Sequence, residues 1–231
     1  GCRRVPEGAG GCRRVRREVY MKDLKVRVIS SLFLLLYLWF FLWLDSLLLT
    51  CVALAPIVIA TFYEVNGSIS LDRVGVMSFI NAYLVVGFSA ILFVKQLYGA
   101  KVLFVLVLIA VVADSFAYAF GRFFRGPKLC PSISPSKTIS GFLGGVSMAW
   151  IIGYFAYMDL VPQGFFKHDL IAITIFVAAA VIGDLVESMM KRSLDLKDFG
   201  CVVPGHGGMF DRLDSTLLVT TACLVSRWFE L

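Results

Sequence analysis

Residues 102–120 read VLFVLVLIAVVADSFAYAF, nineteen residues with a single charge, Asp114. A helix of about 20 mostly apolar residues crosses the hydrocarbon core of a bilayer. Similar runs recur along the chain, in which 59% of the 231 residues are hydrophobic and 16% are charged. Soluble domains are usually about 45–50% apolar, with about a quarter of their residues charged. The sequence therefore predicts an all-α integral membrane protein.

The apolar segments predict a polytopic protein with about seven transmembrane helices. Asp45 alone separates the first two segments, which form either a tight helical hairpin or one overlong helix. Six or eight spans are alternative counts, but seven fits the loops best. The segments are 27–44, 46–63, 74–94, 102–120, 140–158, 170–187 and 213–229.

Positive charge is concentrated before the first apolar segment. Residues 1–27 hold nine Lys or Arg against three acids, which leaves 13 basic and 13 acidic residues in the rest of the chain. Because basic segments stay on the cytoplasmic side of a membrane, this predicts a cytoplasmic N-terminus rather than a nucleic-acid-binding surface. Alternation then places loop 64–73 and the basic loops 121–139 and 188–212 on the cytoplasmic side, and loops 95–101 and 159–169 outside.

Two features of composition bound the domain organisation. Residues 1–20 repeat GCRRV in a Gly/Arg-rich context without apolar periodicity, whereas Met21 begins a stretch typical of a membrane-protein start. We predict that 1–20 is a disordered basic extension and that 21–231 is a single transmembrane domain. The six cysteines show no metal-ligand spacing and no disulfide framework.

Acidic residues are grouped at the ends of two neighbouring apolar segments. Asp184, Glu187 and Lys191 are spaced to share one helix face, and Asp211 and Asp214 begin the next segment. A loop between two helix ends can bring such acids together, and a carboxylate cluster suits Mg²⁺, which takes oxygen ligands. The alternative is that these acids balance nearby cations, although an acid inside an apolar run, such as Asp184, is energetically expensive.

The segment GHGG, residues 205–208, predicts a loop that can approach an anion. Glycines let backbone N–H groups come close to a phosphate, and His206 could donate a hydrogen bond or move a proton. The alternative is a simple tight turn after Pro204.

A second basic loop, GRFFRGPKLCPSISPSKTISGFLGG at 121–145, contains four cations and no acid. That composition suits a polyanion such as a nucleoside triphosphate, with Lys137 and Arg122 as charge partners. The alternative is a topology signal. Asp114 lies in the segment just upstream, and an intramembrane acid is a functional candidate unless it pairs with a neighbouring helix. Together the motifs predict metal-assisted phosphoryl or nucleotidyl transfer at the membrane surface.

These motifs resemble the phosphatidate cytidylyltransferases, or CDP-diacylglycerol synthases. The family signature runs from Ser-x-x-Lys-Arg through Lys-Asp and Pro-x-His-Gly-Gly to Asp-Arg-x-Asp, and this chain matches it over 188–214. The resemblance extends to D-x-x-A-Y-x-x-G-R at 114–122 and SPSKT at 134–138. It covers residues 21–231, and so implies that this domain is catalytic.

The resemblance implies transfer of a cytidylyl group from CTP to phosphatidate, giving CDP-diacylglycerol and pyrophosphate. Mg²⁺ is the implied cofactor, with K⁺ as a candidate second cation. The metal ligands are expected to be Asp184, Asp211 and Asp214. The expected catalytic residues are Asp184, Asp211, His206, Lys191 and Lys197. The expected substrate-binding residues are Arg122, Lys137, Thr138, Arg192, Gly207, Gly208, Arg212 and Asp114.

Further expectations follow from the same resemblance. It implies a homodimer. The charges of the loops place the active site at the cytoplasmic face, and we expect the membrane to be the bacterial inner membrane. One position departs from the pattern, because Ser140 stands where the family usually has glutamate. The resemblance therefore does not predict the contacts made at this position of the site.

Other functions share part of this logic. A CTP-dependent transferase could act on another lipid phosphate or on a lipid alcohol, and a lipid kinase would release CDP instead of pyrophosphate. An ion-coupled transporter would use Asp114 and Asp184 as ion sites. The transporter is disfavoured because the polar residues cluster in two loops on one side and the sequence shows no inverted repeat.

Overall fold

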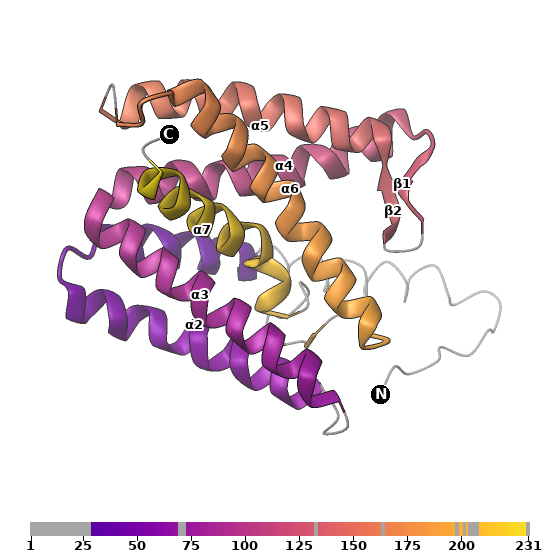
Figure 1. Cartoon of the computed structure of the whole chain (residues 1–231), viewed down its shortest axis with the longest axis horizontal. Coiled ribbons are helices and arrows are strands. Elements are labelled where there is room, and N and C mark those ends of the chain that lie inside the picture. Colours follow the sequence, from indigo (N-terminus) through magenta and orange to yellow (C-terminus); the bar gives the residue numbers. More distant parts are fainter. Residues whose placement is uncertain are drawn as a thin grey trace.

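The computed structural model describes residues 29–68, 73–131, 134–162, 165–196, 199–200, 202 and 208–229. Within these ranges each predicted apolar segment contains one α-helix, and the helices pack as a bundle (Figure 1). The helices are Ile29–Trp43, α2 (Leu47–Ser68), α3 (Val74–Tyr98), α4 (Ala100–Phe124), α5 (Ile139–Leu160), α6 (Asp169–Ser193) and α7 (Asp214–Trp228). The predictions for residues 1–20 lie outside the described residues.

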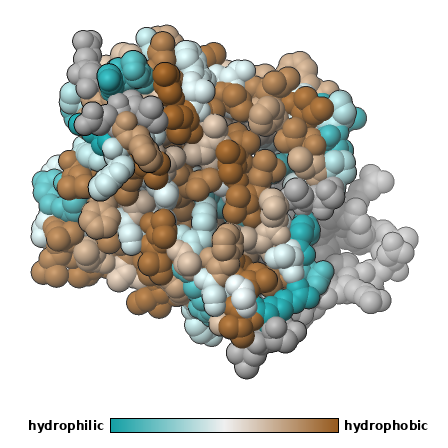
Figure 2. Space-filling view, in the orientation of Figure 1, coloured by the Kyte–Doolittle hydropathy of each residue, from teal (hydrophilic) through white to brown (hydrophobic). Residues whose placement is uncertain are grey.

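The outer surface of the bundle is apolar, as the composition predicts. Large hydrophobic side chains such as Trp43 and Leu48 are 75% and 72% exposed. Brown hydrophobic residues cover most of the face in Figure 2, and the most hydrophilic groups lie toward the helix ends. Five helices, α2 to α6, are long and apolar enough to span a membrane. This confirms an all-α integral membrane protein, whereas the exact number of spans stays a prediction.

The first two predicted spans form a helical hairpin, because residues 44–46 around Asp45 are not helical and separate the two helices. The Tyr37 hydroxyl donates a hydrogen bond to the carbonyl of Ala53, which lies on the opposite side of the break. Such a contact requires the chain to reverse direction. The alternative of one overlong helix is wrong.

Small residues let α4 and α5 approach each other closely. These two helices make the most extensive contact in the bundle (Figure 1). A Cβ on Gly145 would lie 2.7 Å from the Ala113 carbonyl oxygen, and one on Gly141 would lie 2.5 Å from the Ala117 carbonyl oxygen. In membranes, helices are held together by packing of this kind, which small residues permit.

We expect Gly145→Leu to destabilise the bundle, because the added side chain meets backbone atoms of α4 that cannot move independently. Overpacking of this kind typically costs about 1–3 kcal/mol. The measurement is the thermal unfolding midpoint in detergent. Gly75→Leu is the matched control, since nothing lies within 4 Å of a Cβ at that position. Equal unfolding midpoints for the two variants would contradict the close packing of α5 against α4 at Gly145.

Part of the basic loop 121–139 is more ordered than predicted. It contains an antiparallel hairpin of β1 (Lys128–Cys130) and β2 (Ser134–Thr138), with Lys128 opposite Thr138. The Thr138 side chain then accepts a hydrogen bond from the N–H of Gly141 and caps α5. The hairpin therefore positions Lys137 directly before a helix start.

The connections predicted to share one side of the membrane do meet at one end of the bundle. Arg73, before α3, forms an ion pair of 3.1 Å with Asp195, just after α6. At the opposite end, the Tyr157 hydroxyl donates a 2.5 Å hydrogen bond to Asp169. The alternation of the loops therefore agrees with the structure.

Candidate active site

A cavity of about 600 Å³ opens at the end of the bundle that carries the basic loops. It lies between α4, α5, α6, the β hairpin and the short 3₁₀ helix η2 (Phe210–Arg212). Most of the predicted site residues that the structure describes line this cavity. They are Asp114, Arg122, Lys137, Thr138, Asp184, Lys191, Asp211, Arg212 and Asp214, and Glu187 lies among them.

Three carboxylates converge in the cavity from two helices. Asp184 and Glu187 lie one turn apart on α6, and Asp214 is the first residue of α7. One carboxylate oxygen from each lies within 4.8 Å of the others. Glu187 is 2% exposed and Asp214 is 6% exposed. We call these residues the carboxylate triad.

A glycine brings the two helices of the triad together. A Cβ on Gly183 would lie 2.9 Å from both the Asp214 carbonyl oxygen and the Ser215 Cα, so α7 begins directly against α6. The Tyr83 hydroxyl of α3 donates a 3.1 Å hydrogen bond to the Asp214 carbonyl and fixes the start of α7 from the other side. The triad is therefore held by backbone packing.

The triad fits a divalent cation. Glu187 Oε1 is buried and has no hydrogen-bond partner among the described residues. A buried carboxylate oxygen without a partner is energetically costly, and so is the close approach of three acids. A hard cation with oxygen ligands would satisfy both, so these three residues could hold Mg²⁺.

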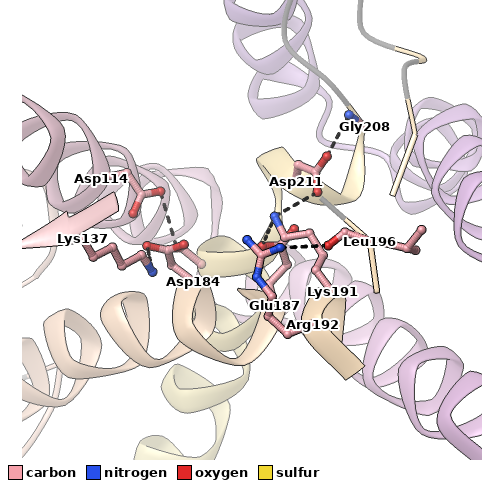
Figure 3. A network of polar contacts seen from close by, with 10 residues as sticks. Asp114, Lys137, Asp184, Glu187, Lys191, Arg192, Leu196, Gly208 and Asp211 are labelled. Carbon is pink, nitrogen blue, oxygen red and sulfur yellow. Dashed lines mark hydrogen bonds and ion pairs between the residues drawn. The ribbon is translucent and has the colours of Figure 1, made fainter. Parts of the chain in front are cut away.

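Lys191 connects the triad to η2. Its Nζ lies 2.6 Å from Glu187 Oε2 and 3.4 Å from Asp211 Oδ1 (Figure 3). The other Asp211 oxygen accepts a 2.9 Å hydrogen bond from the Gly208 N–H. Asp211, predicted as a leading metal ligand, therefore lies beside Lys191 and outside the triad that the described residues form. Its role as a direct ligand stays a prediction.

The environment of Asp211 favours its ionised form. Burial alone would raise the pKa of this carboxyl. The neighbouring Glu187 side chain, the Lys191 ammonium and the N–H of Gly208 together outweigh burial and hold the pKa of Asp211 below its ordinary value. Asp211 therefore stays a charged partner for Lys191 throughout the neutral pH range.

The opposite wall of the cavity supplies another cation. Lys137 Nζ, from β2, lies 2.5 Å from Asp184 Oδ2 (Figure 3). Asp114, from α4, accepts a 3.4 Å hydrogen bond from the Ser215 hydroxyl. Lys137 was predicted as a phosphate partner, and its place at the cavity wall beside the triad is compatible with that role.

The two predicted arginines of α4 and α6 differ in their position relative to the cavity. Arg122 lines it and donates a 2.8 Å hydrogen bond to the Tyr118 hydroxyl. Arg192 donates to the Leu196 carbonyl at 3.2 Å and is not among the described residues that line the cavity. Ser140 donates to the Arg125 carbonyl, so it holds the start of the hairpin where the resemblance expects a charged side chain.

Some predicted residues cannot be placed. Lys197, His206 and Gly207 lie outside the described residues, so their roles stay predictions. Gly208 is described and buried, and its N–H contacts Asp211.

Sequence reasoning missed two acids. Glu187 was recognised as part of the helix face of Asp184, but it was not assigned to the metal. Glu64 of α2 was not considered, although it is 6% exposed and accepts hydrogen bonds from the N–H groups of Val202 and Met209 at 2.8 and 2.6 Å. Its position one residue beyond the apolar segment 46–63 was the available signal.

Comparisons of the sequence with known proteins found one family model and several similar proteins. The sequence model of the cytidylyltransferase family matches residues 12–229. A phosphatidate cytidylyltransferase of Bacillus subtilis is 34% identical over 213 residues, which cover 86% of this chain and 78% of the relative. A protein of the same name from Helicobacter pylori is 32% identical over 209 residues, with 90% and 76% covered. One from Staphylococcus aureus is 37% identical over 139 residues, with 60% and 53% covered.

Proposed function

This chain belongs to the cytidylyltransferase family, and we propose that it transfers a cytidylyl group from CTP to phosphatidate. The products are CDP-diacylglycerol and pyrophosphate, and the chain is thus a nucleotidyltransferase of phospholipid synthesis. The observation that carries the proposal is the cavity in which the carboxylate triad faces Lys137 and Lys191. That arrangement supplies both a metal site and cations for phosphate groups.

We propose that Mg²⁺ is held by Asp184, Glu187 and Asp214. The unpartnered Glu187 oxygen and the 4.8 Å grouping of the three carboxylates support this ligand set. When bound, Mg²⁺ neutralises triphosphate oxygens and makes the α-phosphorus a better electrophile. K⁺ as a second cation stays a prediction.

The cations of the cavity then bind and orient the triphosphate of CTP and the phosphate of the lipid. Lys137 can exchange its contact with Asp184 for a triphosphate oxygen, and Arg122 and Arg212 also line the cavity. A phosphatidate oxygen forms the new bond to the α-phosphorus, and the bond from that phosphorus to the bridging oxygen of pyrophosphate breaks. The attacking phosphate is already ionised at neutral pH, so the step requires no strong general base.

The membrane setting follows from the two substrates. A diacyl lipid stays in the bilayer while CTP is soluble, so their phosphates have to meet at the headgroup level. We propose that the cavity and the N-terminus face the cytoplasm across a bacterial inner membrane, which the basic residues of loop 121–139 support. A homodimer is proposed from the family resemblance alone, and light scattering of the detergent-solubilised protein would measure it.

The proposal is tested with purified protein, Mg²⁺, labelled CTP and phosphatidate. We expect label in the extractable lipid together with an equimolar amount of pyrophosphate. Release of CDP would identify a lipid kinase. Labelling only with a polyprenol phosphate or a diether phosphate would identify a different lipid acceptor. A folded protein without any lipid product would overturn the proposal.

Removing the cation of β2 should weaken the use of CTP. We expect Lys137→Met to lower kcat/KM for CTP by about 10²-fold, because loss of one preorganised charge partner has an effect of that order. Lys101→Met, at the exposed opposite end of α4, is the control and should leave this value unchanged. Unchanged kcat/KM in Lys137→Met would exclude a direct phosphate contact.

A further inference from the structure

A second cavity, of about 250 Å³, lies inside the bundle between the helix Ile29–Trp43, α2, α3, α4 and the start of α7. We call it the apolar groove. Its lining is almost entirely aliphatic and aromatic, and it includes Leu38, Phe41, Leu54, Ile57, Phe88 and Val107. Protein interiors are close-packed, so an apolar space of this size between helices is a candidate binding site for an apolar ligand. The chemistry of the lining selects a hydrocarbon chain.

The apolar groove is adjacent to the active-site cavity. Arg212 lines both spaces, and it is the only charged residue that lines the groove among those described. The next residue, Leu213, lines the groove, and Asp214 after it belongs to the triad. The triad and the end of the groove are therefore separated by no more than the residues 212–214. A lipid whose phosphate lies at the triad has the groove directly beside its headgroup.

The apolar groove has both a buried floor and exposed margins. Leu54 and Phe88 are each 5% exposed, whereas Leu35 and Val111 are 62% and 54% exposed. The exposed margin belongs to the apolar outer surface of the bundle, where lipid tails lie. A tail could therefore enter the groove sideways from the bilayer while its headgroup stays at the level of Arg212.

These observations together point to one occupant. We propose that the apolar groove binds one acyl chain of the lipid phosphate substrate, with Arg212 as the contact between that phosphate and the groove. This inference rests on the proposed function and adds a chain-binding subsite to it. It predicts that the enzyme senses the length of the acyl chain through residues on α2 and α4.

Filling the apolar groove should discriminate between substrates of different chain length. In mixed micelles, the kcat/KM for dioleoyl phosphatidate is compared with that for dihexanoyl phosphatidate, whose short tails fill little of the groove. We expect Val107→Trp to lower the long-to-short ratio by at least about 10-fold, because a 1.4 kcal/mol loss of tail binding corresponds to that factor. Ile57→Trp, from α2, fills the same groove independently and should act alike.

The control is Ile59→Trp, two residues from Ile57 on α2 but 67% exposed, which should leave the ratio unchanged. If the tryptophan variants fail to fold, Val107→Leu and Ile57→Phe fill less space and give the same comparison. An equal fall for both substrates, or an unchanged ratio in folded variants, would overturn the chain-binding role and favour a structural lipid in the groove. Failure of the unsubstituted protein to use either phosphatidate would contradict the proposed function.

Discussion

Glu187→Gln is expected to lower kcat by at least about 10³-fold and to remove the stabilisation that Mg²⁺ confers on the folded protein. The triad has three carboxylates with oxygens within 4.8 Å, and the substitution replaces one oxygen ligand with an amide that binds a hard cation poorly. Metal-assisted charge stabilisation contributes several kcal/mol to such reactions, and about 4 kcal/mol corresponds to the stated factor.

The two readouts of this variant are independent. A ligand that binds only the folded state stabilises it by about 2.7 kcal/mol at 100 times its Kd, so Mg²⁺ should raise the unfolding midpoint of the unsubstituted protein. Without Mg²⁺, Glu187→Gln should be at least as stable as the unsubstituted protein, because it relieves the crowding of acids. Asp195→Asn is the matched control, since its side chain is 83% exposed and pairs only with Arg73 in the described ion pairs.

The same measurement decides between two ligand sets. The resemblance implies Asp211 as a ligand, whereas the structure groups Glu187 with Asp184 and Asp214. If Asp211 acts through Lys191, Asp211→Asn keeps the Mg²⁺-induced shift and loses activity. Loss of the shift in Asp211→Asn, together with its retention in Glu187→Gln, would show that the structural assignment is wrong.

Much of the helix arrangement could be predicted from local pattern. Each apolar segment contains a helix, because long uncharged runs have few alternatives in a membrane. The ends were less accurate: α6 continues to Ser193 and α4 to Phe124, beyond the predicted 187 and 120. Charged residues such as Lys191 and Arg122 fall outside an apolar criterion, yet they continue a helix that has already formed.

The site could be predicted only where its residues share one helix face or one motif. Asp184 and Glu187 lie on a single turn, so their proximity follows from helical spacing. The pairing of Lys137 with Asp184, and the contacts of Glu64 with residues 138 and 145 positions away, depend on how helices pack. No periodicity in the sequence encodes that packing, so these contacts were found only in the structure.

Glu64→Gln should lower activity by about 10²-fold while the Mg²⁺-induced stabilisation stays intact. Glu64 lies near the end of α2, and its two oxygens accept the N–H groups of Val202 and Met209. A Cβ on Gly200 would lie 2.5 Å from Glu64 Oε1, and one on Gly208 would lie 3.1 Å from Oε2. The Glu64 carboxylate thus holds two backbone segments, one at Val202 and one at Met209. The adjacent Gly208 N–H in turn donates to Asp211.

The expected loss follows from how an amide differs from a carboxylate. In Glu64→Gln one acceptor becomes an NH₂ donor that faces a backbone N–H, so one charge-assisted hydrogen bond is lost and η2 shifts relative to Lys191. A change of about 1 Å near reacting groups can reduce a rate about 10²-fold. Glu64→Ala should also lower the unfolding midpoint, because two N–H groups lose their acceptor at a cost of about 1–3 kcal/mol each when buried.

Asn66→Ala is the control for this helix end, since Asn66 is exposed and bonds to Asn81 and to its own helix. The kcat and the Mg²⁺-induced shift of the unfolding midpoint are measured for all three variants. Reduced kcat with a normal shift assigns Glu64 a positioning role, because the triad still binds its cation. A lost shift would place Glu64 in the metal site, and unchanged kcat in both Glu64 variants would show that the reaction does not depend on the contact between α2 and η2.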